Sequence, residues 1–206
     1  MKKLMIVATI AMVAITSQAV QVKWGSTNLY APDSNGSISD KVVWDGSKYN
    51  LATDGKITTA GAVEAFIWES VTASDVSYKA GDLWNWYENG KTGTPVGEGA
   101  TKYTGVNSSS TLTVNGGAAY NKDDVVHAAI LYVFTDGDGN KWYMENAADA
   151  TIKSSTTTVS GLAMFQGGGA VNVEHTVMSW QSVPEPTSGL LLLLGVAGLA
   201  LRRRRA

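Results

Sequence analysis

One short loop carries the residue types that a hard cation needs. The stretch Asp136-Gly137-Asp138-Gly139-Asn140 places side-chain oxygens at alternate positions, and its glycines permit a sharp turn. A complete EF-hand loop also needs a glutamate at its twelfth position, which is Ala147 here, whereas Glu145 is the tenth. The same five residues suit a polar turn between two strands. We therefore expect a hairpin turn, with a weak calcium site at Asp136, Asp138 and Asn140 as the alternative and no other cofactor.

Three aromatic residues, Trp84, Trp86 and Tyr87, stand close together in the stretch DLWNWYENG. If exposed, their rings could stack on sugar rings while the neighbouring Asp and Asn side chains bond to hydroxyl groups. If the stretch is helical, Trp84 and Tyr87 share a face with Leu83 and pack into a core. We expect core packing, and contact with a glycan is the alternative.

The remaining titratable residues do not form a recognisable catalytic set. The two histidines, His127 and His175, lie in strand-like runs, and without cysteine they are poor evidence for a zinc site. Hydroxyls and carboxylates are abundant, so a Ser-His-Asp triad stays open, but no Gly-x-Ser-x-Gly elbow is present. Glu64 and Glu69 are five residues apart in one expected strand and therefore face opposite ways. We expect the protein not to be an enzyme.

The elements that would position these residues are mostly strands. A mostly two-residue periodicity between frequent turn signals predicts strands at 20–29, 125–135 and 141–145, and the apolar run at 62–69 predicts a buried strand. The Asp45-Gly46 turn predicts a hairpin. The Thr151–Val159 and Leu162–Gln166 runs suggest a further strand pair, and 170–183 suggests the last strand. About eight to ten short strands predict an all-β domain, an antiparallel β-sandwich of the jelly-roll or immunoglobulin-like type.

One short helix is expected between residues 72 and 89. Thr72 or Ser74 could cap its start, and the apolar residues that follow recur near a helical period. Gly81 weakens such a helix by about 1 kcal/mol relative to alanine. Asn89-Gly90 would end it.

The charge of the chain is divided between its ends and its middle. The whole chain of 206 residues has a formal charge of −2, but residues 20–183 contain ten lysines, no arginine and seventeen carboxylates, a net charge of −7. An acidic domain argues against nucleic acid as a partner. The chain has no cysteine, so a domain in residues 20–183 must be stable without disulfides.

Residues 1–19 have the pattern of a secretory signal peptide. Lys2 and Lys3 give a basic start, Leu4–Ile15 is almost entirely apolar, and Ser17-Gln18-Ala19 places small residues at a cleavage site. The apolar run of twelve residues is below the ~20 that span a bilayer. We expect signal peptidase to cut after Ala19.

The C-terminal segment 184–206 is built in the order of a processing signal. The fifteen mostly apolar residues at 187–201 would form a helix of about 22 Å, short of the ~30 Å hydrocarbon core. Arg202, Arg203, Arg204 and Arg205 would remain on the cytoplasmic side. Pro184 and Pro186 prevent the helix from running back into the domain.

Val183-Pro184-Glu185-Pro186, followed by the Gly/Leu/Ala segment and the four arginines, resembles the PEP-CTERM sorting signal. The resemblance covers about 23 residues at the tail. It implies that an exosortase, a membrane enzyme of Gram-negative bacteria, recognises Pro184, Glu185 and Pro186 and cleaves near them. It also implies delivery to the cell surface or the extracellular polysaccharide matrix, where biofilm-forming bacteria use such proteins.

Three functions remain in view for residues 20–183. We expect a structural or adhesive role at the surface or in the matrix. Binding of matrix polysaccharide through Trp84, Trp86 and Tyr87 is the alternative, and a small hydrolase is the least favoured. Signal peptidase, an exosortase-like enzyme and, through the tail, the membrane are the expected partners.

Overall fold

The structure is a computed structural model that describes the chain from Val22 to Val183 with gaps. The described residues are 22–44, 49–52, 54–72, 76–97, 100–107, 111–115, 120–153, 157–159, 165–166, 176–177 and 179–183. The predicted signal peptide with Ala19, His175 and the whole segment 184–206 lie outside the described residues.

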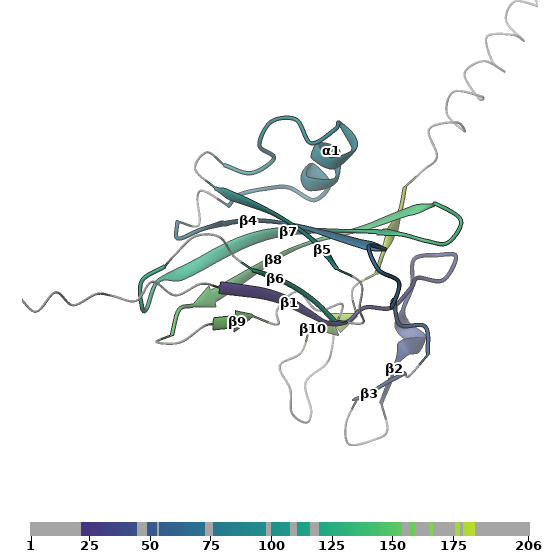
Figure 1. The fold of residues 1–206 in the computed structure, drawn as a ribbon. Helices are drawn as coiled ribbons and strands as arrows, with labels where there is room; N and C mark the ends of the chain where they lie inside the picture. Colours follow the sequence, from purple (N-terminus) through teal and green to yellow (C-terminus); the bar gives the residue numbers. More distant parts are fainter. Residues whose placement is uncertain are drawn as a thin grey trace, which may run out of the picture.

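The described residues are mostly β-strand with one α-helix, as the sequence predicts, and they also contain one 3₁₀ turn (Figure 1). In chain order the elements are β1 Val22–Asn28, η1 Ser39–Lys41, β2 Val42–Trp44, β3 Tyr49–Leu51, β4 Val63–Ser70, α1 Asp82–Glu88, β5 Thr101–Asn107, β6 Thr111–Asn115, β7 Val125–Thr135, β8 Lys141–Thr151, β9 Thr157–Val159, β10 Phe165–Gln166, β11 Thr176–Val177 and β12 Gln181–Ser182.

A five-stranded antiparallel sheet forms the middle of the domain, in the order β12-β8-β7-β4-β5. The inner strands β4 and β7 are buried along most of their length. A strand covered on both faces needs a nearly continuous apolar run rather than strict alternation. The sequences VEAFIWES and VVHAAILYVFT meet that need.

A second sheet has the order β6-β1-β9. In Figure 1 it lies on one side of the five-stranded sheet, and α1 lies on the other side. β1 pairs with β6 in antiparallel fashion, but β9 runs parallel to β1, which corrects the expectation of antiparallel pairing throughout. The chain leaves β8 in one sheet and enters β9 in the other, so no tight hairpin dictates the direction of β9.

The main buried cluster contains side chains from both sheets. Val22 and Trp24 of β1 and Leu112 and Val114 of β6 join residues of β4, β7 and β8 in one apolar cluster. At Gly105 of β5 an added Cβ would lie 2.6 Å from a methyl carbon of Val114, so glycine is needed for this close approach. The jelly-roll or immunoglobulin-like connectivity stays a prediction.

A second buried cluster lies on the other face of the five-stranded sheet, under α1. It contains Phe66 and Trp68 of β4, three residues of β7, Val96, and Leu83, Trp84 and Trp86 of the helix. The helix ends at Asn89-Gly90 as predicted, but it begins at Asp82, so the predicted cap at Thr72 or Ser74 is wrong. Gly81 takes the left-handed conformation with φ 94°, and the helix starts only after it.

Both predicted hairpins form. β2 pairs with β3 in antiparallel fashion, and residues 45–48 between them lie outside the described residues. β7 pairs with β8 in unbroken register from Thr135↔Lys141 to Val125↔Thr151. The pair predicted from 151–159 and 162–166 is wrong, because β9 joins β1 and β10 joins β11. The sequence did not predict β5, which pairs with β4 along its whole length.

Candidate functional site

The structure places Trp84 and Trp86 inside the cluster under α1. Their side chains are 7% and 8% exposed. The Trp84 ring stacks on Tyr143 of β8 at 4.5 Å between centroids, and Trp86 meets the Trp68 ring edge-on at 4.9 Å. Both tryptophans therefore attach the helix to the sheet, which is the core role that the sequence favours.

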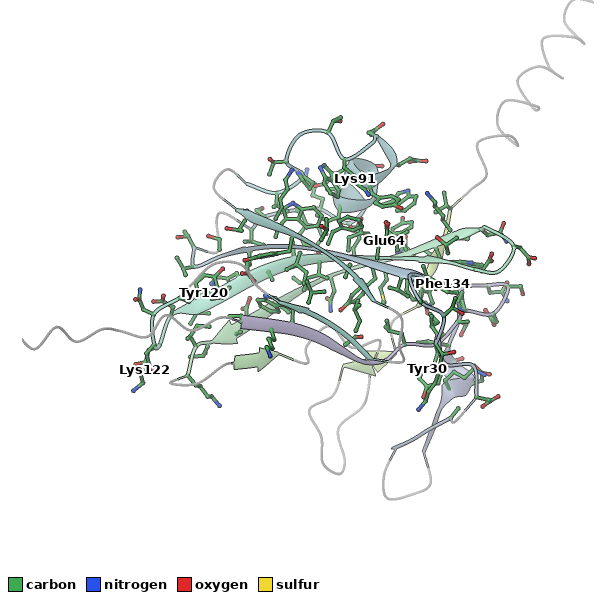
Figure 2. All side chains as sticks on the ribbon, viewed as in Figure 1. Tyr30, Glu64, Lys91, Tyr120, Lys122 and Phe134 are labelled. Carbon is green, nitrogen blue, oxygen red and sulfur yellow. The ribbon has the colours of Figure 1, made fainter. Side chains whose placement is uncertain are left out.

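Tyr87, the third aromatic of the set, is half-buried and surrounded by charged groups. Its hydroxyl donates a hydrogen bond of 2.9 Å to Glu64 Oε2 of β4, and its ring lies 4.9 and 5.1 Å from the ammonium groups of Lys91 and Lys141. Figure 2 labels Glu64 and Lys91 on the helix side of the sheet. Burial first, and then the Glu64 hydrogen bond, raises the pKa of Tyr87 to about 12.

Glu145 of β8 caps the helix, a role that the sequence did not reveal. Its Oε2 accepts a hydrogen bond of 2.8 Å from the Gly81 N–H, and its Oε1 accepts one of 2.6 Å from the Trp84 N–H. The first N–H groups of a helix have no partner within the helix and attract a negative group. Burial raises the pKa of Glu145, although these two hydrogen bonds lower it. No local signal could reveal a cap that comes from 61 residues away.

Asp136 organises the turn between β7 and β8. Its Oδ1 accepts hydrogen bonds from the backbone N–H groups of Asp138 and Asn140, and its Oδ2 accepts them from the Asn140 amide and the Trp142 indole. Desolvation would raise the pKa of Asp136, but these hydrogen bonds together lower it. The four bonds support the turn role, and the weak calcium site at Asp136, Asp138 and Asn140 stays a prediction. Among the described residues, no three His, Cys, Asp or Glu side chains come together as metal ligands.

The histidine and glutamate candidates lie apart. His127 pairs with its cross-strand neighbour Asp149, with 2.8 Å between Nδ1 and Oδ1 at the surface. Glu64 and Glu69 lie on opposite faces of β4, as predicted, because Glu64 contacts Tyr87 on the helix side and Glu69 contacts Trp24 of the other sheet.

Glu69 forms the most unusual polar site in the described part of the chain. It is 1% exposed and accepts hydrogen bonds from the Trp24 indole, the Tyr103 hydroxyl at 2.6 Å and the Tyr120 hydroxyl at 2.7 Å. Burial, followed by the bond to Glu69, raises the pKa of Tyr120 well above its ordinary value. The three donors come from three separate segments, so the carboxylate joins the two sheets at one end of the core.

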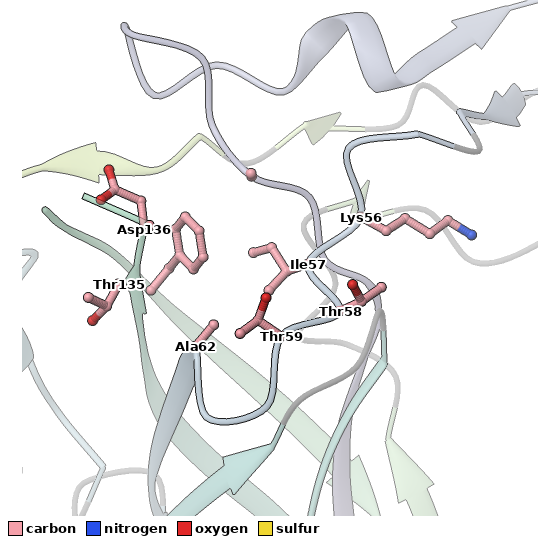
Figure 3. Close-up of a pocket in the computed structure, with 10 residues that line it drawn as sticks. Lys56, Ile57, Thr58, Thr59, Ala62, Thr135 and Asp136 are labelled. Carbon is pink, nitrogen blue, oxygen red and sulfur yellow. The ribbon is translucent and has the colours of Figure 1, made fainter. Parts of the chain in front are cut away.

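A groove opens at the other end, where β7 turns into β8. Two adjoining hollows of about 230 and 410 Å³ share Ala31, Phe134, Asp136 and Gly137. In the smaller hollow, Figure 3 shows Thr135 and Asp136 opposite residues 57–59, with Lys56 pointing away.

The larger hollow is lined by residues 31–34, Asn140 and Trp142. The Trp142 ring is partly exposed. Carboxylates, hydroxyls and an amide surround aromatic side chains, a composition that suits a polar ligand with an apolar face.

The C-terminal end of the described chain lies beside this groove. β12 pairs with the start of β8, and the buried Trp180 just before it packs against Phe134 of the groove at 5.6 Å. Described residues end at Val183, one residue before the Pro184-Glu185-Pro186 sequence. No helix in the described ranges is both long and apolar enough to cross a membrane, and the predicted segment 187–201 lies outside those ranges.

Comparison with protein families matches residues 182–205 to the family described as the PEP-CTERM protein-sorting motif. The chain carries a PEP-CTERM sorting motif. The matched range begins inside β12 and includes the predicted sorting residues Pro184, Glu185, Pro186 and the arginines of the tail. The PEP-CTERM motif implies an exported protein that passes through the membrane, with an exosortase as a partner. No curated protein and no solved structure matches the chain.

Proposed function

We propose that residues 20–183 form a non-catalytic β-sandwich with a structural or adhesive role at the cell surface or in the extracellular polysaccharide matrix. The sandwich part of the proposal is supported by the buried cluster that the two sheets share. The destination is supported by the PEP-CTERM motif that follows the domain.

One observation carries the proposed role: the side chains that could do chemistry stabilise the fold instead. Glu145 caps the helix, Asp136 organises a turn, and Glu69 joins the two sheets. Trp84 and Trp86 fill the cluster under the helix. These side chains are engaged in contacts within the fold, which stabilises the folded state. A structural protein without disulfides needs that stability.

The route to the surface is part of the proposal. Signal peptidase removes residues 1–19 after Ala19, and the apolar segment 187–201 holds the precursor in the inner membrane of a Gram-negative host for a limited time. Arg202–Arg205 stay on the cytoplasmic side. The exosortase then recognises Pro184-Glu185-Pro186 and releases the domain.

The structural role is tested by complementation. A strain that lacks the protein should attach less well and form a less cohesive matrix. The wild-type chain and a His127→Ala/Asp149→Asn variant should restore both properties equally, because a structural role does not need this pair. Loss of function in that variant, with unchanged secretion and folding, would point to catalysis instead.

Polysaccharide binding is the second candidate, and the groove favours it. The sequence points to Trp84, Trp86 and Tyr87, but the two tryptophan rings are buried, whereas Trp142 is partly exposed at the larger hollow. In affinity electrophoresis through gels of matrix polysaccharide, Trp142→Ala should abolish retardation, and Trp84→Ala should reduce it only as far as it destabilises the fold. Absence of retardation on every polysaccharide would remove this candidate.

A further inference from the structure

The sorting motif and the folded domain overlap at β12. Gln181 and Ser182 pair with Tyr143 and Trp142 of β8, and the Val183 N–H donates a hydrogen bond of 3.2 Å to the Lys141 carbonyl. The PEP-CTERM match begins at residue 182. The first two residues of the motif therefore lie along the edge of the sheet, and Val183 is hydrogen-bonded to it.

Trp180 fastens the chain to the core immediately before β12. It is 2% exposed, its indole N–H donates to the Tyr30 carbonyl at 2.9 Å, and its backbone N–H donates to the Gly36 carbonyl at 2.9 Å. Gly36 has φ 81°, and a Cβ there would lie 2.0 Å from the Trp180 carbonyl oxygen. The closeness of the two backbones holds Trp180 firmly in place.

β12 itself is held far less firmly than Trp180. It has two residues, Gln181 and Ser182, and both are exposed. A short edge strand with few buried contacts lies at the low-stability end of local opening. The strand can leave β8 while Trp180 stays in the core.

The enzyme that cuts near Pro184-Glu185-Pro186 acts directly beside the folded domain. Only three residues, Pro184 to Pro186, lie between Val183 and Thr187, where the apolar segment begins. The four Cα-to-Cα steps from Val183 to Thr187 span at most roughly 14 Å in an extended chain. The start of β8 and the groove beside it are therefore held close to the membrane until the tail is cut.

We propose that processing passes through a state in which β12 has left β8, and that Trp180 limits how far the chain opens. Trp180 is then a positioning residue that sets where the domain ends and the cleavable segment starts. This inference rests on the proposed processing by an exosortase. Cleavage of a transiently opened segment follows the population of the open state when closing is fast.

A disulfide between β12 and β8 tests the proposal in the full-length chain. Register partners in antiparallel strands have Cα atoms about 4.5–5.5 Å apart, within the range that a disulfide bridges. The chain has no cysteine of its own, so Ser182→Cys with Trp142→Cys introduces a single lock. In pulse-chase labelling of the producing cells, the variant with this disulfide formed (the locked variant) should lose its tail about tenfold more slowly or slower still. A thiol reductant should restore the wild-type rate of tail removal.

Each single cysteine variant controls for the change of side chain, including the change within the motif. His127→Cys with Asp149→Cys is the matched control, because it places a disulfide between register partners of β7 and β8 away from β12. Six Gly/Ser residues inserted between Val183 and Pro184 should restore rapid processing even in the locked variant. Equal processing of the locked variant and the single variants would overturn the proposal.

Trp180→Phe tests the anchoring step separately. It keeps a ring in the core but loses the hydrogen bond to the Tyr30 carbonyl. Its tail should be removed faster than that of the wild type, and adding the β12–β8 lock should return it to the locked rate. An unchanged rate would overturn the role of Trp180. If the wild-type tail were never removed, while the protein reached the membrane, the exosortase assignment itself would fail.

Discussion

Glu69 and Glu64 lie on opposite faces of the same strand, β4, and they differ in burial and in the number of hydrogen bonds that they accept. Glu69 faces the second sheet, is fully buried, and accepts hydrogen bonds from Trp24, Tyr103 and Tyr120. Glu64 faces the helix, where its side chain is 35% exposed and accepts one hydrogen bond from Tyr87, with Lys91 4.0 Å away.

The difference follows from access to water. A carboxylate removed from water must regain its hydrogen bonds from protein donors, whereas a partly exposed one keeps much of its hydration. Glu69 recovers three bonds from donors on separate segments, so its site depends on the whole fold. On the helix face, Tyr87 of α1 bonds to Glu64 of β4, and Glu145 of β8 joins the start of α1 to the sheet.

Replacing Glu69 should have the largest effect. Glu69→Gln turns one acceptor oxygen into a donor that faces other donors in a buried site, and it should lower the free energy of unfolding by about 2–4 kcal/mol. Urea unfolding followed by tryptophan fluorescence measures this loss.

Glu64→Gln is the matched control, because it makes the same chemical change on the same strand. It should cost less than about 1 kcal/mol, since the side chain keeps its contact with water. Equal losses for the two variants would show that the two faces do not differ as described.

Removing the helix cap should have the next largest effect. Glu145→Ala leaves the Gly81 and Trp84 N–H groups without their acceptor and should cost about 1–2 kcal/mol. Glu88→Ala, which changes an exposed glutamate in the same helix, is the control. Hydrogen exchange should accelerate in α1 and remain slow in β4 and β7, and uniform acceleration would argue against a local cap.

Glu145 should also give a pH signature. Burial raises its pKa in the folded state above the ordinary 4.5, despite the hydrogen bonds that lower it. The folded protein therefore binds more protons than the unfolded protein just above pH 4.5, and the stability due to Glu145 falls as the pH rises through its folded pKa. The unfolding free energy of the wild type minus that of Glu145→Gln should therefore decrease as the pH rises above 4.5. An increase with pH would contradict a pKa raised by burial.

Replacing Tyr87 should have a smaller effect on stability than replacing Glu69 or Glu145. Tyr87→Phe removes the hydrogen bond to Glu64 and should cost about 0.5–1.5 kcal/mol. Ultraviolet titration should show one tyrosine fewer ionising near pH 12, because burial and Glu64 raise the pKa of Tyr87 to about 12. Tyrosine ionisation that is unchanged in the variant would contradict this assignment.

The sequence predicts the parts of this molecule that depend on neighbours along the chain. The β7–β8 hairpin follows from strand patterns around a polar turn, and the opposite orientation of Glu64 and Glu69 follows from the two-residue repeat of a strand. The end of α1 at Asn89-Gly90 follows from helix-ending residues.

The sequence does not predict contacts between distant segments. Glu145 caps α1 from another strand, so the helix starts at Asp82 rather than near Thr72. The donors to Glu69 and the approach of Gly36 to Trp180 likewise join segments far apart in the chain. Such contacts depend on tertiary packing, which local propensity does not encode.

Intact-mass measurement of the protein recovered from membrane, surface and culture medium tests the central claim most directly. The account predicts a surface or medium species that begins at Val20 and ends close to Pro184, and a Pro184→Ala/Pro186→Ala variant that keeps its tail and accumulates in the membrane fraction. Recovery of the full-length chain from the cytosol, with residues 1–19 and the arginine tail intact, would contradict it.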